Sequence, residues 1–538
     1  MAIAPTFERR PCFHVSVVTE CDCFLRNDVF PMLLEDIRLP SDARYPVTVA
    51  QDLILATLAI HPTTSVFQMP SLGFRFAGAT VQEETIVFIL KYLIRRHCAF
   101  RLRFEPCRGL STSQRDADLL RFRRTGLLQT PLHTQVLLDV SDVELSTADL
   151  RGFSDSCRDH EFRRLYGVEQ RRPFTYSQPL LRAWLVRLAE QDSIVVLFVD
   201  HMVADGRSMK LLAFEFGQLF LDHAFRCPQS TSPADHSFLE FAKWQAEACS
   251  LGAFRKEMLY WRQQWVECGG GRVLPEDLPF TLPHRDNSER PFGAIGRSFG
   301  HSVSAEIIRF ARRSEITIHT LFVAVVALTL NRYTGKDVLG IWMHFANRAR
   351  LAWRRGIGWF ANTHLIGIRI EENRSGDDLL KQVRSSVLNG IENQQLPLGH
   401  MWQVLRCHPR FRDANILVDF NSRRTGDSPH FLTDGGTLRR IDLPDESTPR
   451  LSTLGVYVDQ QGQDVSVRIR YATSLYPDEA METVLHDLQV ITQLLITSPD
   501  SSLGHLMSSV APRVDPSRAS NGAGADFVVT GTDLIPAI

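Results

Sequence analysis

The stretch Ser193-Ile-Val-Val-Leu-Phe-Val199, which runs into Asp200-His201-Met-Val-Ala-Asp205-Gly206, decides the fold of this chain. The apolar, mostly β-branched and aromatic residues after Ser193 predict a strand that is covered on both faces. From 207 to 220 the apolar residues recur at helical spacing, so we expect a helix after a short loop. A buried strand that leads through a loop into a helix indicates a central sheet in an α/β protein.

Similar alternation extends through the chain and indicates a mixed α/β fold. The patterns predict helices at 83–96 and 306–313 and strands at 195–199, 416–420 and 465–471. The longest apolar run, 321–330, is about half of the ~20 residues that a bilayer span requires. We therefore expect it to form a buried helix, and we predict no membrane association.

Composition and charge narrow the classes of function. The chain has 538 residues, of which 22% are charged and 44% hydrophobic, which is typical of a folded protein. Its 60 basic and 61 acidic side chains leave a net charge of -1, so no overall field attracts nucleic acid. The 10 cysteines form no repeated CxxC pair, and no apolar segment precedes Arg9. These features predict reduced thiols, no metal site and a cytoplasmic protein.

A polar stretch rich in proline and serine, from Cys227 to Asp235, separates two helix-rich regions and predicts a linker between lobes. We therefore place an N-terminal lobe at 46–228 and a C-terminal lobe at 229–510. The small, polar tail at 511–538 is typical of disorder. Residues 1–45 form an N-terminal extension to which we assign no role.

His201, Asp205 and Gly206 are the candidate chemical groups, because they lie where the buried strand ends and its helix begins. An imidazole at this position can take a proton from an attacking amine or hydroxyl, an effect worth about 10²–10⁴ in rate. Asp205 can fix the loop or cap the helix, and Gly206 allows backbone or substrate to approach closely. The alternative is that His201 is only a hydrogen-bonded core residue.

Two other patterns resemble functional motifs. His430-Phe-Leu-Thr-Asp434-Gly435 repeats the spacing of the first motif, but it lies in turn-rich sequence, and we interpret it as a loop. Gly296-Arg-Ser298-Phe-Gly300 matches the nucleophile elbow of serine hydrolases. That elbow requires a preceding buried strand, and 290–295 is a poor strand sequence, so we do not predict hydrolase chemistry.

Arginines form three clusters, for which we consider both internal ion pairs and the docking of an acidic partner. The clusters are Arg95, Arg96, Arg101 and Arg103; Arg163, Arg164, Arg171 and Arg172; and Arg348, Arg350, Arg354 and Arg355. Arg348 differs from the others because the apolar stretch 338–345 is expected to carry it into the interior as a strand. A buried guanidinium there requires a carboxylate partner.

Several segments in a fixed order resemble the condensation domains of nonribosomal peptide synthetases, within the chloramphenicol-acetyltransferase-like superfamily. The resemblance covers about 46–508 and is strong through the order and spacing of its segments. They are Val47-Thr-Val-Ala-Gln51, Arg96-His97-Cys-Ala-Phe-Arg101-Leu-Arg-Phe104, Arg172-Pro-Phe174 with Gln178-Pro-Leu-Leu-Arg182, His201 to Gly206 with Ser208, Tyr260-Trp261, Asn331-Arg332-Tyr333-Thr334-Gly335, Asn347-Arg348, Gly358-Trp-Phe-Ala-Asn362-Thr363, and Tyr471 with Leu475-Tyr476.

The resemblance implies an α/β fold with two chloramphenicol-acetyltransferase-like lobes in a V and a central tunnel that passes His201. It implies that His201 is the catalytic or positioning histidine and that Asp205 pairs with Arg348 as structural support. Gly206 would line the reaction centre, while Asn362, Ser208 and Asp200 would lie along the tunnel. The implied chemistry is attack of an amine or alcohol on a thioester carbonyl, with no bound cofactor and a donor carried on phosphopantetheine.

Asp200 departs from the family, whose motif has a histidine at this position. Successive strand residues point to opposite faces, so we expect Asp200 to point away from His201 and to be structural. An altered or lost activity is the alternative.

The leading hypothesis is a stand-alone, monomeric condensation enzyme. It would join an acyl or aminoacyl group from a carrier protein supplied in trans to a small-molecule or carrier-bound acceptor, as an amide or an ester. The alternatives are a coenzyme A-dependent acyltransferase of the same fold and a catalytically silent module that docks a carrier.

Overall fold

The computed structural model describes most of the chain between 43 and 510, and its strands form three sheets. The residues that it describes are 43–60, 69–125, 128, 131–139, 142–224, 234–267, 277–282, 292–397, 399–400, 416–423, 430–431, 435–444 and 453–510. The linker predicted at 227–235 lies outside these residues up to 233, and the extension predicted at 1–45 lies outside them up to 42. The tail predicted at 511–538 also lies outside them.

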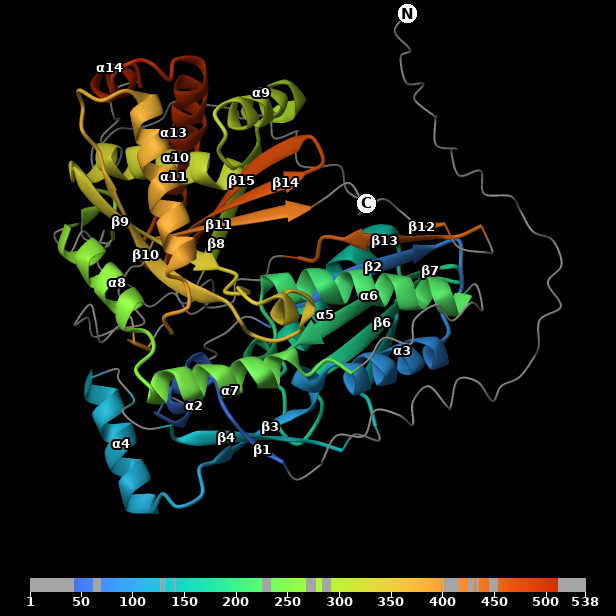
Figure 1. Cartoon of the computed structure of the whole chain (residues 1–538). Coiled ribbons are helices and arrows are strands. Elements are labelled where there is room, and N and C mark those ends of the chain that lie inside the picture. The colour runs from blue at the N-terminus through green and yellow to red at the C-terminus, as the bar shows by residue number, and fades with distance from the viewer. Residues whose placement is uncertain are drawn as a thin grey trace, which may run out of the picture. The chain divides into compact units, whose positions relative to one another are not determined.

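The first six-stranded sheet contains the motif strand β7 near its centre. Its strand order is β12-β13-β2-β7-β6-β5, and all pairs are antiparallel except β5 with β6. The strands are β2 (Ser71–Ala77), β5 (Leu145–Asp149), β6 (Leu181–Ala189), β7 (Asp192–Val199), β12 (His430–Phe431) and β13 (Thr437–Ile441). Helices α3 (Glu83–Arg96), α5 (Asp155–Arg171) and α6 (Gly206–Ala224) lie beside it (Figure 1).

Strand β7 is buried on both faces, as its unbroken apolar sequence predicts. On one face Val195, Leu197 and Val199 belong to the core that contains α3 and α6. On the other face Val196 and Phe198 pack with the aromatic residues of α5. This double coverage fixes the strand register, because a slip of one residue would exchange two sets of buried side chains.

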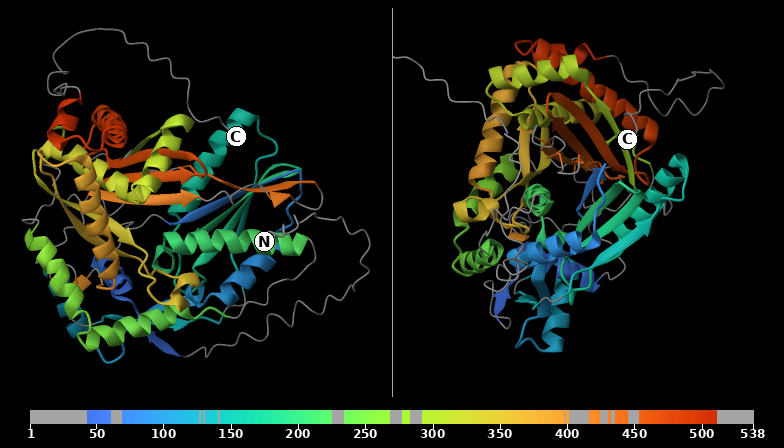
Figure 2. Two further views of the ribbon diagram at one scale, coloured as in Figure 1. Left: turned by 45° about the horizontal axis from the view of Figure 1, so that its top comes forward. Right: turned by 90° about the vertical axis from the view of Figure 1, so that its right-hand side faces the viewer.

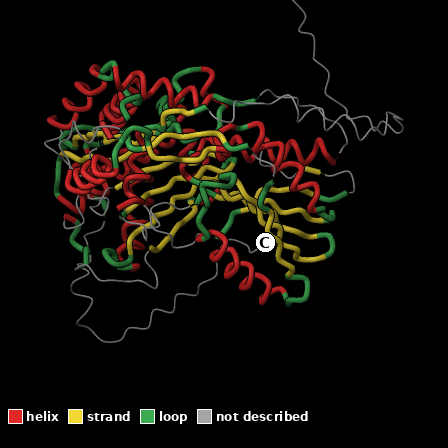
Figure 3. Tube along the Cα trace, turned by 90° about the horizontal axis from the view of Figure 1, so that it is seen from below, coloured by secondary structure: helices red, strands yellow, loops and turns green. Residues whose placement is uncertain are grey.

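The second six-stranded sheet is built entirely from residues after 291, in the order β10-β9-β11-β14-β15-β8. Its strands are β8 (Phe292–Ser298), β9 (Val338–Phe345), β10 (Asn362–Arg369), β11 (Ile416–Arg423), β14 (Leu454–Gln461) and β15 (Asp464–Ala472). Only β11 pairs in parallel, with β9 and β14. Figure 2 shows helices packed beside these strands, and Figure 3 shows the strands of the sheets in yellow.

The helices that accompany this sheet are α9 (Gly300–Arg313), α10 (Ile318–Thr334), α11 (Gly376–Glu392), α13 (Asp478–Thr497) and α14 (Leu503–Ser508). The apolar run 321–330 forms the buried middle of α10, which confirms the predicted core helix. This helix begins where the Thr317 hydroxyl accepts a hydrogen bond from the Thr320 amide, and it ends at Gly335, whose φ of 66° favours glycine.

A three-stranded sheet, four helices and three short 3-10 turns complete the part that the structure describes. The sheet has the order β1-β4-β3, with β1 (Arg44–Pro46), β3 (Leu102–Pro106) and β4 (His133–Leu137). Helices α2 (Val49–Ile60), α4 (Thr112–Thr125), α7 (Ser237–Ser250) and α8 (Arg255–Glu267) and the 3-10 turns η1 (Cys98–Arg101), η2 (His201–Val203) and η4 (Leu351–Arg355) connect these units.

The first large sheet includes strands from both sides of the predicted lobe boundary at 228/229. Strand β13 pairs with β2, so a segment from the C-terminal half completes the first sheet. Leu438 of β13 and Phe238 and Phe241 of α7 belong to the core beneath α3 and α6. The boundary itself stays a prediction, but segments from beyond it are part of the N-terminal core.

Two segments that were not predicted as strands form strands. The poor strand sequence near 290–295 forms β8, which is held at the sheet edge by antiparallel pairing with β15. Because β8 is mostly exposed, it is not the buried strand that a nucleophile elbow requires. The segment interpreted as a loop contains β12, because His430 and Phe431 pair with β13. In both cases pairing with a neighbouring strand outweighs weak local propensity. Asp434, the acidic residue of the second motif copy, lies outside the described residues.

No single helix in the described ranges is long and apolar enough to cross a membrane. Helices α9 and α10 satisfy the length and composition test only as a pair, which is bent by 104° at its break. Within the same ranges Cys98, Cys107, Cys157 and Cys249 are free thiols.

Candidate functional site

His201 opens the 3-10 turn η2, between the end of β7 and the start of α6. Two hydrogen bonds hold the next residue of this turn. The Asp200 carboxylate accepts from the Met202 amide at 2.8 Å, and the Gln51 side-chain amide donates to the Met202 carbonyl at 2.9 Å. Gln51 is fully buried, so α2 supports the turn from the side of the three-stranded sheet.

The His201 ring is partly exposed and lies against Trp359, which comes from the second half of the chain. The two ring centroids are 5.3 Å apart, and the ring planes meet at 65°, an edge-to-face arrangement that aromatic rings favour. Trp359 belongs to the segment 356–361 between η4 and β10. The position of His201 relative to its surroundings therefore depends on how this segment is held.

Asp205 is buried and ties the beginning of α6 to the segment 356–361. Its Oδ1 accepts hydrogen bonds from the Ser208 amide at 2.8 Å and from the Ser208 hydroxyl at 2.9 Å. Its Oδ2 accepts from the Phe360 amide at 3.1 Å and from the Ala361 amide at 3.2 Å. The carboxylate thus caps the helix, as the sequence predicts, and joins two segments about 150 residues apart.

Arg348 is buried beside Asp205, as the resemblance implies. Its Nη2 donates to Asp205 Oδ1 at 2.9 Å and to Ser208 Oγ at 2.8 Å. Its Nη1 donates to the Trp353 and Gly356 carbonyls, each at 2.6 Å. The guanidinium also lies 4.1 Å from the centroid of the Phe360 ring. These contacts compensate for burying a charge, and they bind η4 and the following residues to α6.

Ser208 and Gly206 occupy the first turn of α6. The Ser208 hydroxyl lies 2.7 Å from the Gly358 carbonyl and accepts from the Gly358 amide at 3.1 Å. It is fully buried and belongs to the supporting network. Gly206 is exposed, and a Cβ placed on it would meet no atom within 4 Å. Open space therefore adjoins the start of the helix next to His201.

Asn362 is the first residue of β10 and is buried. Its side-chain nitrogen donates to the Gln394 carbonyl at 2.8 Å and to the Leu396 carbonyl at 3.0 Å. The amide thereby connects β10 to the residues that follow α11. A position on a tunnel stays a prediction for Asn362.

Asp200 lies at the end of β7 and is half-buried. Burial raises the pKa of its carboxyl group to about 6, although the Met202 amide and the charge of Arg182 favour the ionised form. The Asp200 charge in turn adds to the effect of burial, which raises the pKa of Tyr176. Asp200 therefore caps the His201 turn. Its contribution to substrate binding stays a prediction.

Sequence reasoning assigned no role to Gln51, Trp359 or Phe360, although all three lie in segments that resemble the family. The contact between Gln51 and Met202 spans 151 positions, and the one between Phe360 and Asp205 spans 155. No local sequence pattern predicts contacts between residues so far apart. The sequence could have indicated these residues only because Gln51 and the pair Trp359-Phe360 lie in the segments that resemble the family.

The arginine clusters contain several internal ion pairs. Arg163 pairs with Asp159 at 2.8 Å, and Arg172 pairs with Glu169 at 2.8 Å and also with Glu144. Arg354 and Arg355 are exposed on η4. The docking of an acidic partner stays a prediction for the three clusters.

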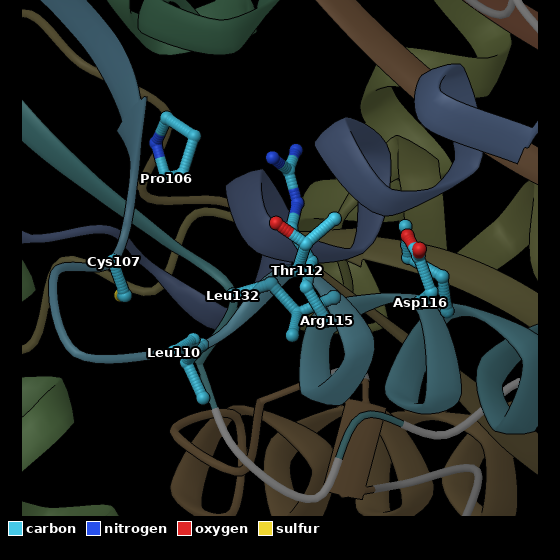
Figure 4. A pocket seen from close by; sticks show the side chains of 8 residues that line it. Pro106, Cys107, Leu110, Thr112, Arg115, Asp116 and Leu132 are labelled. Atoms are coloured by element: carbon cyan, nitrogen blue, oxygen red, sulfur yellow. The ribbon is translucent and has the colours of Figure 1, made fainter.

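A separate pocket of about 390 Å³ lies between strand β3 and helix α4 (Figure 4). Its wall combines apolar side chains with a thiol, a guanidinium and a carboxylate. The lining residues are Pro106, Cys107, Leu110, Thr112, Arg115, Asp116, Leu119 and Leu132. None of them contributes to the network around His201.

Comparisons with known proteins point to one family. A family model described as "Condensation domain" matches residues 107–510. The phosphinothricin tripeptide synthetase PhsC of Streptomyces viridochromogenes is 30% identical over 481 residues, which are 87% of this chain and 41% of that protein. Cyclosporin synthetase simA of Tolypocladium inflatum is 26% identical over 344 residues, 62% of this chain and 2% of that protein. The chain thus spans less than half the length of each of these curated relatives.

Solved structures share the fold. The SgcC5 protein from Streptomyces globisporus superposes with a TM-score of 0.67 at 18% identity, over 85% of this chain and 100% of that chain. The X-domain from teicoplanin biosynthesis gives 0.67 at 16% identity, over 87% and 98%. These likenesses confirm the predicted α/β fold. Because the family model covers most of the chain, including the whole motif that bears His201, the protein belongs to the Condensation domain family.

Proposed function

We propose that this chain catalyses condensation, in which an amine or hydroxyl acceptor attacks the thioester carbonyl of an acyl or aminoacyl donor. A bond forms between the acceptor nitrogen or oxygen and the carbonyl carbon, and the carbon–sulfur bond breaks. The acceptor loses a proton, and the leaving sulfur gains one. The observation that carries the proposal is the position of the partly exposed His201 ring, fixed by a turn that is anchored on both sides and by Trp359.

The roles follow from the contacts. His201 either accepts the acceptor's proton or orients the nucleophile, a contribution worth about 10²–10⁴ in rate. The start of α6 at Gly206 offers amide groups and the positive end of a helix dipole to the oxyanion that develops on the carbonyl. Asp205 and Arg348 touch neither reactant and hold α6 against the segment 356–361.

We further propose that the donor is carried on the phosphopantetheine arm of a carrier protein. The relatives support this, since PhsC is named as a tripeptide synthetase and simA as cyclosporin synthetase. The thioester itself supplies the activated carbonyl, so the chemistry requires acid–base and positioning groups from this chain and no bound cofactor. The acceptor is an amine or an alcohol, and either nucleophile suits the same histidine.

The test is product formation from loaded carriers, detected by intact mass. We expect His201→Ala to lower turnover by about 10²-fold or more while the protein stays folded. His160→Ala is the matched control, because His160 is an exposed histidine on α5. Full turnover by His201→Ala would contradict the assigned role.

Parallel reactions with coenzyme A thioesters separate the alternatives. Faster turnover of the coenzyme A donor than of the carrier donor would identify a coenzyme A-dependent acyltransferase. Carrier binding without any product from either donor would identify a docking module.

A further inference from the structure

His97 lies outside the site described above and is fully buried between two carboxylates. Its Nε2 is 2.7 Å from Glu215 Oε2 on α6, and its Nδ1 is 2.9 Å from Asp235 Oδ2 just before α7. Arg96 reaches the other oxygen of Glu215 at 3.5 Å. His97 therefore connects three segments, namely the end of α3, the middle of α6 and the residues before α7.

Both contacts are hydrogen bonds only when the ring carries a proton on each nitrogen, because ionised carboxylates accept and do not donate. The two neighbouring carboxylates, Glu215 and Asp235, favour the positively charged imidazolium form of His97. Burial alone would lower the pKa of His97, but the hydrogen bonds and charges of Asp235 and Glu215 outweigh it and raise the pKa. The charged ring also holds the pKa of Asp235 at about 2, against the effect of burial.

Asp235 connects His97 to the segment 356–361, which contains Trp359. The same Oδ2 that faces His97 accepts a hydrogen bond from the Ile357 amide at 2.9 Å. Its Oδ1 accepts from the Ser237 amide at 3.0 Å and from the Ser237 hydroxyl. The Asp235 backbone is held as well, because its amide donates to the Arg96 carbonyl at 2.7 Å and its carbonyl accepts from the Cys98 amide at 3.2 Å.

The residues around Ile357 are packed without spare room. A Cβ on Gly356 would overlap Ser237 Oγ, and a Cβ on Gly358 would overlap the Phe238 ring. Arg348 holds the carbonyl of Gly356, and Asp205 holds the amide of Phe360. Between these two, Asp235 holds the amide of Ile357, and Ser208 holds Gly358, the residue before Trp359. Trp359 in turn contacts His201.

We infer that His97 is a positioning residue for the reaction centre, which acts through Asp235 and Ile357 to hold the segment 356–361 and thus Trp359 against His201. The inference rests on the proposed function for its effect on turnover, but its structural part can be tested without any reaction. Loss of the contact would release Ile357, leave Gly356, Gly358 and Phe360 as attached residues of the segment, and allow Trp359 to shift.

Hydrogen exchange provides the direct test. In Asp235→Asn the backbone amides of Ser237 and Ile357, which bind one side-chain oxygen each, can still only donate. The new NH2 group must therefore face one of these two amides. We expect peptides that cover 356–361 to exchange about tenfold faster in Asp235→Asn and in His97→Gln than in the wild type.

Asp487→Asn is the matched control, since Asp487 is a buried carboxylate that pairs with Arg332 at 3.1 Å and with the Tyr333 hydroxyl at 2.9 Å. It should leave exchange in 356–361 at the wild-type rate. Unchanged exchange in both Asp235→Asn and His97→Gln would overturn the inference.

The pH dependence tests whether the protonated form of His97 is the one that holds the segment 356–361. His97 must lose its proton as pH rises through its raised pKa, so exchange in 356–361, corrected for the intrinsic effect of hydroxide, should accelerate above that pH in the wild type. In His97→Gln this acceleration should be absent.

Turnover completes the test. In His97→Gln and Asp235→Asn we expect kcat to fall about tenfold with little change in KM, because the substrate-binding residues stay in place while Trp359 shifts. If the wild type forms no product with any donor, the proposed function fails, and hydrogen exchange still decides the role of His97. If exchange changes while kcat does not, the contact does not position the reaction centre, and the inference fails.

Discussion

At the scale of single residues, the site combines one partly exposed ring with several buried charges. Asp205 and Arg348 compensate each other, whereas Asp200 is a carboxylate whose ionised form is disfavoured by its surroundings. Its side chain nevertheless caps the turn that begins at His201. Asp200 thus lowers the stability of the fold when it is charged, while its oxygen holds the turn in either protonation state.

The free energy of unfolding should depend on pH through the carboxyl group of Asp200. The pKa of Asp200 rises from an ordinary value of 3.8 to about 6 on folding, so the folded state binds more protons between these values, and the free energy of unfolding falls as pH rises through them. Asp200→Asn keeps the capping oxygen and removes the charge. We expect the variant to gain up to about 3 kcal/mol over the wild type between pH 4 and 7. Urea unfolding across this range measures the difference, and a difference that does not vary with pH would contradict the assignment.

At the scale of elements, helix α6 and the segment 356–361 form one unit. Ser208, Asp205 and Arg348 each form hydrogen bonds with this segment, and α7 packs against it. The segment contains two glycines because the start of α7 leaves no room for side chains there. Its path is therefore set by close packing as well as by hydrogen bonds.

A single methyl group should disturb this unit. In Gly358→Ala the added Cβ would overlap the Phe238 ring, so we expect a loss of about 1–3 kcal/mol in unfolding free energy together with lower turnover. Gly217→Ala on α6 is the control, because its Cβ would meet no atom within 4 Å. That variant should be as stable as the wild type or slightly more stable. Equal stability of the two variants would show that the segment can move aside.

At the scale of the whole molecule, the first sheet is completed by a strand from the C-terminal half of the sequence. Strand β13 pairs with β2 and places Leu438 in the core beneath α3 and α6. Residues from α7 and from the segment 353–360 belong to the same core. The N-terminal sheet therefore cannot bury its apolar face fully without residues from the C-terminal half.

This dependence can be measured with one substitution. Leu438→Ala should cost about 2–5 kcal/mol, as expected for a buried leucine, and should accelerate hydrogen exchange in β2 and β7 rather than in the second sheet. Leu388→Ala, at a half-exposed leucine on α11, should change stability by no more than about 0.5 kcal/mol. Unchanged exchange in β2 and β7 would show that β13 adds little to the sheet.

The sequence was informative wherever structure depends on local pattern. Strand β7, helices α3 and α6 and the buried helix α10 followed from hydrophobic periodicity. Strands β8 and β12 were missed because both exist only through pairing with a neighbour. In the site, the resemblance placed Asp205 beside Arg348. The contacts of Trp359 with His201 and of His97 with Asp235 join residues more than 130 positions apart, and no periodicity reports such pairs.

One helix sets the distance between the two anchoring systems. Ser208 and Glu215 lie seven residues apart on α6, which places them on the same side of the helix about 10 Å apart. Ser208 belongs to the network of Arg348, and Glu215 belongs to that of His97. One extra residue inserted between them would rotate Glu215 by about 100° away from its histidine while the serine kept its partners. The number of residues between Ser208 and Glu215 therefore tolerates less variation than the lengths of the loops at the ends of α6.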